Sequence, residues 1–391
     1  MSKRSFLLIL FLMFGFLPTA ILLLFGTYRH LDWYTKNYAS ELGELFGLPV
    51  RVEMISHHSP GNGRIHGITV FQPGETQDPL ATAPWGDWFE YDILREGKEV
   101  RLIKWTLPEL TLADECLEVI WTKHQRLLEQ AEKWKNREIV LSVKKQVRVG
   151  EEANAIELIQ AEARIHLENG EPQTDVVFQI PEDNGQNAQI VLSLKRVMLN
   201  HSELIQATIT TDTRGISTRY LKGLFPMLEQ LGEEARFTGS IAVQQSFSRW
   251  TGLFRGRFDL VDTKVLFPNG GLAGWGTLNV EKARFDGAQL ILADGDFRVT
   301  QGMVSRKLLE NFMTAAQLIT KGILEPGEKL AFQELAFRFQ IRDGQMQIFG
   351  NCQGVGAGIY LTGSHGPILS EPTFLRQPFS RTMFWEKLLT Q

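Results

Sequence analysis

The stretch FRFQIRDGQMQIFG, residues 337–350, contains two runs in which apolar and polar side chains alternate. A spacing of two places the apolar side chains of each run on one face of a β-strand. The pair Asp343-Gly344 lies between the runs, and Asp-Gly favours the two-residue turn of a β-hairpin. The stretch therefore predicts an antiparallel hairpin whose apolar face is formed by Phe337, Phe339, Ile341, Met346 and Ile348.

Runs with the same alternation fill much of the chain after residue 49. Examples are residues 64–71, 100–107, 176–180, 190–194 and 236–243. Glycine-containing turns separate several of these runs, and successive short strands joined by tight turns are typical of an antiparallel meander. The sequence therefore predicts a mainly β protein with an elongated antiparallel body.

Four segments outside the N-terminal region are predicted to be helical: residues 34–46, 114–134, 217–231 and a segment that opens at Ser305. In 114–134 the apolar residues are three and four positions apart, so one face is expected to pack on a sheet or to bind a partner. The third segment has Pro226 as a break or kink. The last helix is expected to have an apolar face formed by Leu308, Leu309, Phe312, Met313, Ala316 and Ile319.

The segment from residue 5 to residue 28 carries no charged side chain. As a helix, its apolar run would extend roughly 30 Å, the thickness of the hydrocarbon core of a bilayer. It predicts a single transmembrane helix; the alternative is a signal peptide, but no small-x-small cleavage site follows the run. The tail with Lys3 and Arg4 is expected in the cytoplasm, and the body on the other side of the membrane.

Composition excludes several classes of protein. The net charge is -4 and no run of Lys or Arg resembles a nucleic-acid-binding footprint, so nucleic acid is not an expected partner. Only two cysteines occur, Cys116 and Cys352, which excludes a cysteine-rich zinc site and a dense disulfide framework. We expect two buried thiols, with one long-range disulfide as the alternative.

The sequence contains no catalytic constellation, so the chain is not expected to be an enzyme. The glycines of residues 354–358 predict a turn rather than a phosphate loop, because no helix follows them. His57, His58 and His66 lack carboxylates or cysteines at ligand spacing nearby. Residues 294–296, Asp-Gly-Asp, are predicted to be a turn rather than a calcium loop. No metal and no cofactor are expected.

Two groups of segments resemble AsmA-like envelope proteins. The N-terminal group is LFGLPVRVEMI (45–55), PGNGRIHGITVFQPGE (60–75) and LPELTL (107–112). The C-terminal group is FTGSIAV (237–243), WTGLFRGRFDL (250–260), GMVSRKLLENF (302–312) and ELAFRFQIRDGQMQIFGN (334–351). The chain is therefore expected to divide into a tail and transmembrane anchor (1–28), an N-terminal AsmA-like β region (29–112), a helix with a β meander (113–215) and a C-terminal AsmA-like β region (216–391). The resemblance implies the two AsmA-like regions, whereas the middle region rests on its periodicity alone.

The resemblance also implies a function and a location. It implies a single-pass protein of the inner, cytoplasmic membrane with its body in the periplasm, which handles membrane lipid or supports outer-envelope biogenesis through an open apolar β groove. The apolar side chains of the 337–350 hairpin would then face lipid. The alternative is a membrane-tethered scaffold that binds another envelope protein, with the same side chains in a closed core.

Overall fold

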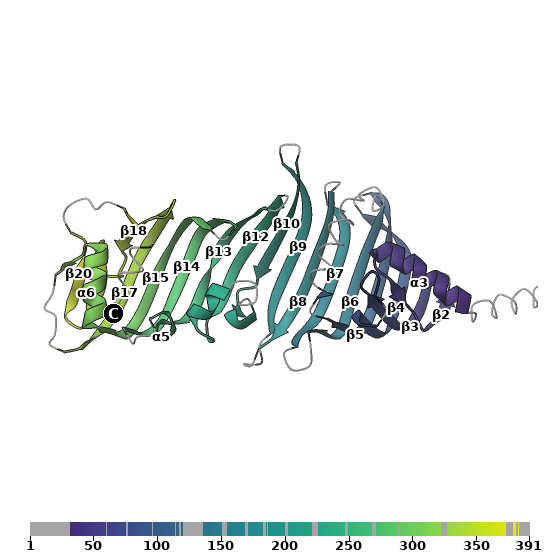
Figure 1. Cartoon of the computed structure of the whole chain (residues 1–391), viewed down its shortest axis with the longest axis horizontal. Helices are drawn as coiled ribbons and strands as arrows, with labels where there is room; N and C mark the ends of the chain where they lie inside the picture. The colour runs from purple at the N-terminus through teal and green to yellow at the C-terminus, as the bar shows by residue number, and fades with distance from the viewer. Residues whose placement is uncertain are drawn as a thin grey trace, which may run out of the picture. The chain divides into compact units, whose positions relative to one another are not determined.

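The computed structural model describes residues 32–382 except 60, 76, 96, 114, 117–118, 120–135, 151–154, 169–170, 183–184, 186, 200–201, 221–225, 247–248, 268–270, 288, 322–326, 373–377 and 381. The described chain is mainly β with few helices (Figure 1), which confirms the predicted class. It divides into two compact units, residues 1–181 and 182–391. This division into compact units does not test the four regions predicted from the sequence, which therefore stay a prediction.

The N-terminal unit begins with a helix and continues as a sheet. Its elements are α3 (Asp32–Phe46), β1 (Val50–Arg51), β2 (Met54–Ser59), β3 (Asn62–Phe71), β4 (Pro79–Arg95), β5 (Lys98–Leu112), β6 (Arg137–Val149), β7 (Ile156–Glu168) and β8 (Glu171–Pro181). Strands β1 and β2 both pair with β3, and from β3 onward each strand pairs with the next. Residues 39 and 42 of α3 are buried in a cluster with side chains of β2, β3, β4 and β5.

One pair in this unit corrects the expectation of a wholly antiparallel body: β5 and β6 are parallel. A parallel pair needs a long crossover connection, whereas an antiparallel pair can be joined by a tight turn. Residues 113–136 form that connection. The helix predicted at 114–134 falls within it, and most of that segment lies outside the described residues.

The C-terminal unit is built on eight strands that pair in sequence. They are β9 (Asn187–Leu199), β10 (Ser202–Thr211), β12 (Arg236–Ser246), β13 (Arg249–Asp262), β14 (Leu272–Asp286), β15 (Gln289–Ser305), β17 (Lys329–Arg342) and β18 (Gln345–Gly350), and every pair is antiparallel. Shorter strands extend the sheet: β11 (Ile216–Ser217), β16 (Ile319–Thr320), β19 (Ile359–Gly363), β20 (Gly366–Ser370) and β21 (Phe379–Ser380). Figure 1 shows the eight long strands side by side.

The predicted hairpin is confirmed. Strands β17 and β18 pair up to Arg342 opposite Gln345, which leaves Asp343 and Gly344 as the turn. Both turn residues have positive φ, 48° and 78°. Two successive positive φ angles define the type I′ turn, which Asp-Gly adopts readily because glycine has no Cβ and aspartate tolerates this region.

The helix that opens at Ser305 is also confirmed, as α6 (Arg306–Ala316). The Ser305 side chain accepts a hydrogen bond from the backbone N–H of Leu308, which caps the first turn. Gln317 is left-handed and ends the helix. Ile319 therefore lies beyond α6, in β16, and is 43% exposed. The prediction that Ile319 belongs to the apolar face of this helix is wrong.

The segment 217–231 is not the single α-helix expected. Its described parts are two 3₁₀ helices, Thr218–Tyr220 (η3) and Pro226–Leu231 (η4). Proline at position 226 starts η4, since its fixed φ suits a first helical residue and its missing N–H prevents a continuous ladder. A further short helix, α5 (Thr263–Leu266), follows β13.

Among the described residues, no helix has both the length and the apolar character needed to cross a membrane. The span predicted at residues 5–28 lies outside them.

Candidate functional site

An apolar row of eight side chains crosses the sheet of the C-terminal unit, one from each long strand. Cross-strand pairs join its members in turn: Leu192, Ile209, Ile241, Phe254, Ala283, Ala293, Ile341 and Met346. Directly paired residues point to the same side of an antiparallel sheet, so the whole row lies on one face. Its seven steps of about 4.8 Å span roughly 34 Å, comparable with the hydrocarbon core of a bilayer.

A second row on this apolar face explains several glycines of the sequence. It joins Gly239, Gly256, Val280, Gly295, Phe339 and Ile348. A Cβ on Gly256 would lie 2.4 Å from Cε2 of Phe237, and a Cβ on Gly295 would lie 2.7 Å from Cζ of Phe339. The glycines therefore leave the space that neighbouring aromatic rings fill, and the face stays apolar there.

The opposite face of the same strands carries many polar and charged side chains, and several of its charges are paired. One row joins Thr238, Arg257, Asn279, Asp296 and Arg338. Arg257 lies 2.7 Å from Asp259, and Arg338 lies 3.2 Å from Glu281. The two faces therefore differ sharply in chemistry, as expected for strands with strict alternation.

Residues 294–296 belong to this arrangement and correct a prediction. They lie inside β15 rather than in a turn. Asp294 forms an ion pair with Arg342 at 2.7 Å, and Asp296 accepts a hydrogen bond from the Asn279 amide at 2.9 Å. Both carboxylates point to the polar face, and Gly295 between them lies on the apolar face, so the segment satisfies the alternation of a strand.

The five side chains predicted to face lipid all lie on the apolar face, at its C-terminal end. Phe339, Ile341, Met346 and Ile348 are buried, at 9%, 7%, 3% and 2% exposure, and Phe337 is half-buried. Helix α6 packs there: the Phe312 ring lies 5.9 Å from the Phe337 ring, and all these residues belong to one core cluster or pack against it. This burial favours a closed core over an open surface at the hairpin, and lipid contact there stays a prediction.

The apolar face is unevenly covered on the strands that precede β14, where Ile241 is 1% exposed and Ile190 and Leu194 are 5% and 6% exposed. In the row, Leu192, Ile209 and Phe254 are half-buried rather than buried. Ile205 and Val243, on the same face, are half-buried as well. Sequence reasoning missed these positions as lipid-contacting candidates. Their alternation was visible, but alternation reveals which face a side chain is on and not what covers it.

The N-terminal unit has a matching row, formed by Trp88, Trp105, Leu141, Ala163 and Val176. Helix α3 covers its first strand, with the Tyr38 ring 5.7 Å from the Trp88 ring. Leu141, Ala163 and Val176 are half-buried. Within the described part of the chain, Nε1 of the buried Trp105 has no hydrogen-bond partner, so this face also holds an unused donor.

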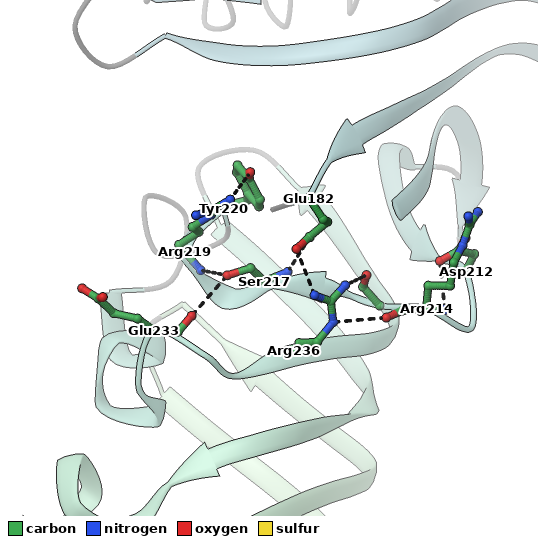
Figure 2. A network of polar contacts seen from close by, with 9 residues as sticks. Glu182, Asp212, Arg214, Ser217, Arg219, Tyr220, Glu233 and Arg236 are labelled. Carbon is green, nitrogen blue, oxygen red and sulfur yellow. Dashed lines mark hydrogen bonds and ion pairs between the residues drawn. The ribbon is translucent and has the colours of Figure 1, made fainter. Parts of the chain in front are cut away.

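A polar network in the C-terminal unit is centred on Glu182 and Arg236 (Figure 2). The Glu182 carboxylate lies 2.9 Å from Nη1 of Arg236 and accepts a hydrogen bond from the backbone N–H of Ser217 at 3.2 Å. Arg236 also donates to the carbonyl oxygens of Arg214 and Gly215. The Glu182 side chain is 6% exposed and that of Arg236 is 22% exposed, so a largely buried ion pair joins the start of the unit to β12, and the network extends to residues 214–217.

A hollow of about 400 Å³ lies beside β10, β12, β13 and β14. Its lining is mainly hydroxyl and charged side chains, including Thr210, Ser240, Arg255 and Arg257. Among the described residues, no group of three or more His, Cys, Asp or Glu side chains could hold a metal ion. Residues 354–358 are turns, as predicted.

Both cysteines are free and buried, which confirms the preferred reading of the sequence. Burial raises the pKa of the Cys116 thiol to about 11. Burial, and secondarily the nearby Glu334 carboxylate, raise the pKa of Cys352 to about 12. The reactive thiolate is therefore rare at neutral pH at either position.

We expect neither native cysteine to react with iodoacetamide while the protein is folded, since both thiols are protonated and shielded. The measurement is intact mass before and after denaturation. As a control, Leu253→Cys introduces a thiol at a position with 49% exposure and should be alkylated rapidly in the folded protein. Rapid alkylation of the unaltered protein would contradict the burial of Cys116 and Cys352.

Comparisons with protein-family models, with curated proteins and with solved structures find no match to this chain. The AsmA-like resemblance therefore stays a hypothesis that rests on the segments quoted above.

Proposed function

We propose that this chain is a membrane-anchored envelope protein that handles lipid along the apolar faces of its sheets. The proposal includes the anchor at residues 5–28 and a periplasmic body. The observation that carries it is the apolar row of the C-terminal unit, which continues without a polar member from Leu192 to Met346.

The half-buried part of the row is the proposed lipid contact. The side chains of Leu192, Ile209 and Phe254 are half-buried, so part of their carbon surface is accessible to a ligand. An acyl chain laid on this surface would remove apolar area from water, which is worth about 25 cal/mol per Å². The row has no polar groups to hold a lipid at one place, so the chemistry favours many weak contacts along the sheet over one deep site.

The N-terminal unit supports the same proposal. Leu141, Ala163 and Val176 of its row are half-buried, so they also leave carbon surface partly accessible.

Photo-crosslinking tests the proposal at adjacent positions on opposite faces. Ile209 and Thr208 follow each other on β10, and both are half-buried. Benzoylphenylalanine at position 209 of the full-length protein, irradiated in cells, is expected to give adducts of lipid mass. The same group at position 208, on the polar face, is expected to give none.

Two results would contradict the proposal. Adducts of protein mass at position 209 would favour the alternative, a membrane-tethered scaffold that binds another envelope protein. No adduct at 209 in a protein that melts normally would mean that this face is a closed core.

A further inference from the structure

We propose that the tip of the β4–β5 hairpin contacts the lipid interface of the membrane that holds the N-terminal segment. The contact is made by Leu94 at the tip and by Tyr91, which lies on the opposite face of the ribbon, and its partner is a bilayer surface. The inference rests on the proposed function, because it takes residues 5–28 to be a membrane anchor.

The start of α3 lies at the same end of the N-terminal unit as the turn between β2 and β3. The Tyr34 hydroxyl is hydrogen-bonded to Nε2 of His57, near the end of β2. Helix α3 ends at Phe46, and the chain then turns back and runs along β1 and β2 to His57. Helix α3 therefore runs opposite to β1 and β2, and its first residues lie at the end of the unit where β2 stops.

Strand β4 extends past this end. His57 pairs with Gly63, and Gly63 pairs with Trp88, so these three residues are level with one another. Strand β3 starts at Asn62, whereas β4 continues with β5 as a two-stranded ribbon to Arg95 opposite Lys98. Leu94 is six residues beyond Trp88, which is roughly 20 Å of strand.

The end of the apolar N-terminal segment lies within a similar distance of the His57 level. That segment ends at residue 28, six residues before Tyr34, and six residues extend roughly 9 Å as a helix or 20 Å as extended chain. Roughly 20 Å is the upper limit for that separation, so the tip of the hairpin extends at least as far from the His57 level as the end of the apolar segment can. A bilayer that holds this segment would meet the hairpin tip at its surface.

The exposed side chains at this end suit a lipid interface. Leu94 is 81% exposed, the largest value among the exposed large apolar side chains of the described residues, and Tyr91 is 48% exposed. Tyrosine favours the membrane–water interface, and an exposed leucine gains free energy by entering it.

The ribbon carries charges of both signs: Arg95 and Lys98 lie opposite each other at the tip, and Glu99 lies opposite Leu94. Arg101, on β5, lies 3.3 Å from the Glu90 carboxylate and 3.5 Å from the Asp92 carboxylate. Both acidic groups of this part of β4 are therefore paired with a cation, which lowers their repulsion from an anionic lipid surface.

A fluorescent probe at Leu94 tests the inference in the full-length chain. Leu94→Cys, labelled with an environment-sensitive dye, is placed in phosphatidylethanolamine–phosphatidylglycerol nanodiscs with or without doxyl-labelled lipid. Leu253→Cys, an exposed position in the C-terminal unit, is the matched control, and the native thiols are buried. We expect a blue shift and loss of fluorescence with doxyl lipid for the Leu94 probe and neither change for the Leu253 probe.

Alkaline carbonate extraction separates the two ways to fail. If the chain resists extraction but the Leu94 probe is quenched no more than the Leu253 probe, the hairpin does not contact lipid and this inference is overturned alone. If carbonate releases the chain from membranes, the anchor of the proposed function is overturned, and this inference with it.

Discussion

Replacing Ile348 by aspartate is expected to unfold the C-terminal unit at neutral pH. Ile348 is 2% exposed and belongs to the core cluster that includes α6. A carboxylate there would have no counter-charge, and burial without a partner places such a change among the most destabilising, at more than about 4 kcal/mol. The measurement is thermal unfolding followed by circular dichroism in detergent.

The expected pH dependence identifies the cause. Burial raises the pKa of a carboxyl group, so the folded variant binds its proton at higher pH than the unfolded variant does. The stability of Ile348→Asp should therefore be greatest below the ordinary aspartate pKa of about 4 and should fall as pH rises. A purely steric defect would not show this dependence.

The adjacent residue provides the control. Phe349 lies on the polar face of β18 and is 39% exposed, so Phe349→Asp should cost about 1 kcal/mol or less. If Ile348→Asp melted like Phe349→Asp, the hairpin face would be an open surface. Normal melting with loss of copurifying lipid would support the original sequence prediction that this hairpin contacts lipid.

Replacing Glu182 by alanine is expected to destabilise the C-terminal unit by about 2–4 kcal/mol. The change leaves Arg236, whose side chain is 22% exposed, without its carboxylate partner. It also removes the acceptor of the Ser217 backbone N–H. Figure 2 shows that both groups converge on the Glu182 carboxylate, so two stabilising contacts are lost together.

A second carboxylate paired with arginine shows how burial sets this effect. Asp259 lies 2.7 Å from Arg257, but their side chains are 37% and 59% exposed. Water can replace an exposed partner, so Asp259→Ala should cost about 1 kcal/mol or less. Equal shifts in urea midpoint for the two variants would show that the Glu182 network contributes no more than a surface pair.

Local signals in the sequence account for much of the fold. The turn at Asp343-Gly344, the cap at Ser305 and the alternation of the 337–350 stretch each depend on residues close together in the chain. Period-two alternation was also enough to assign the five hairpin side chains to one face. These features need no long-range contact, because backbone sterics and side-chain chemistry act within a few residues.

The misses have a common cause in contacts between distant residues. Nothing local distinguishes β5 and β6 as a parallel pair, since the strands are joined by a connection of more than twenty residues. Asp294-Gly295-Asp296 has turn-forming composition, yet pairing with Arg342 and Asn279 places it within a strand. Tertiary partners overrode local preference in both cases.

The features of the candidate site also separate into those that local sequence determined and those that the tertiary structure decided. Alternation alone determined that Ile209 and Ile341 lie on apolar faces, because side chains of a strand alternate between the two sides of a sheet. Only the tertiary structure decided that both belong to one row and that Ile341 is buried while Ile209 is half-covered. Coverage depends on which distant segment packs above a face, and in the C-terminal unit α6 packs over one end of the row.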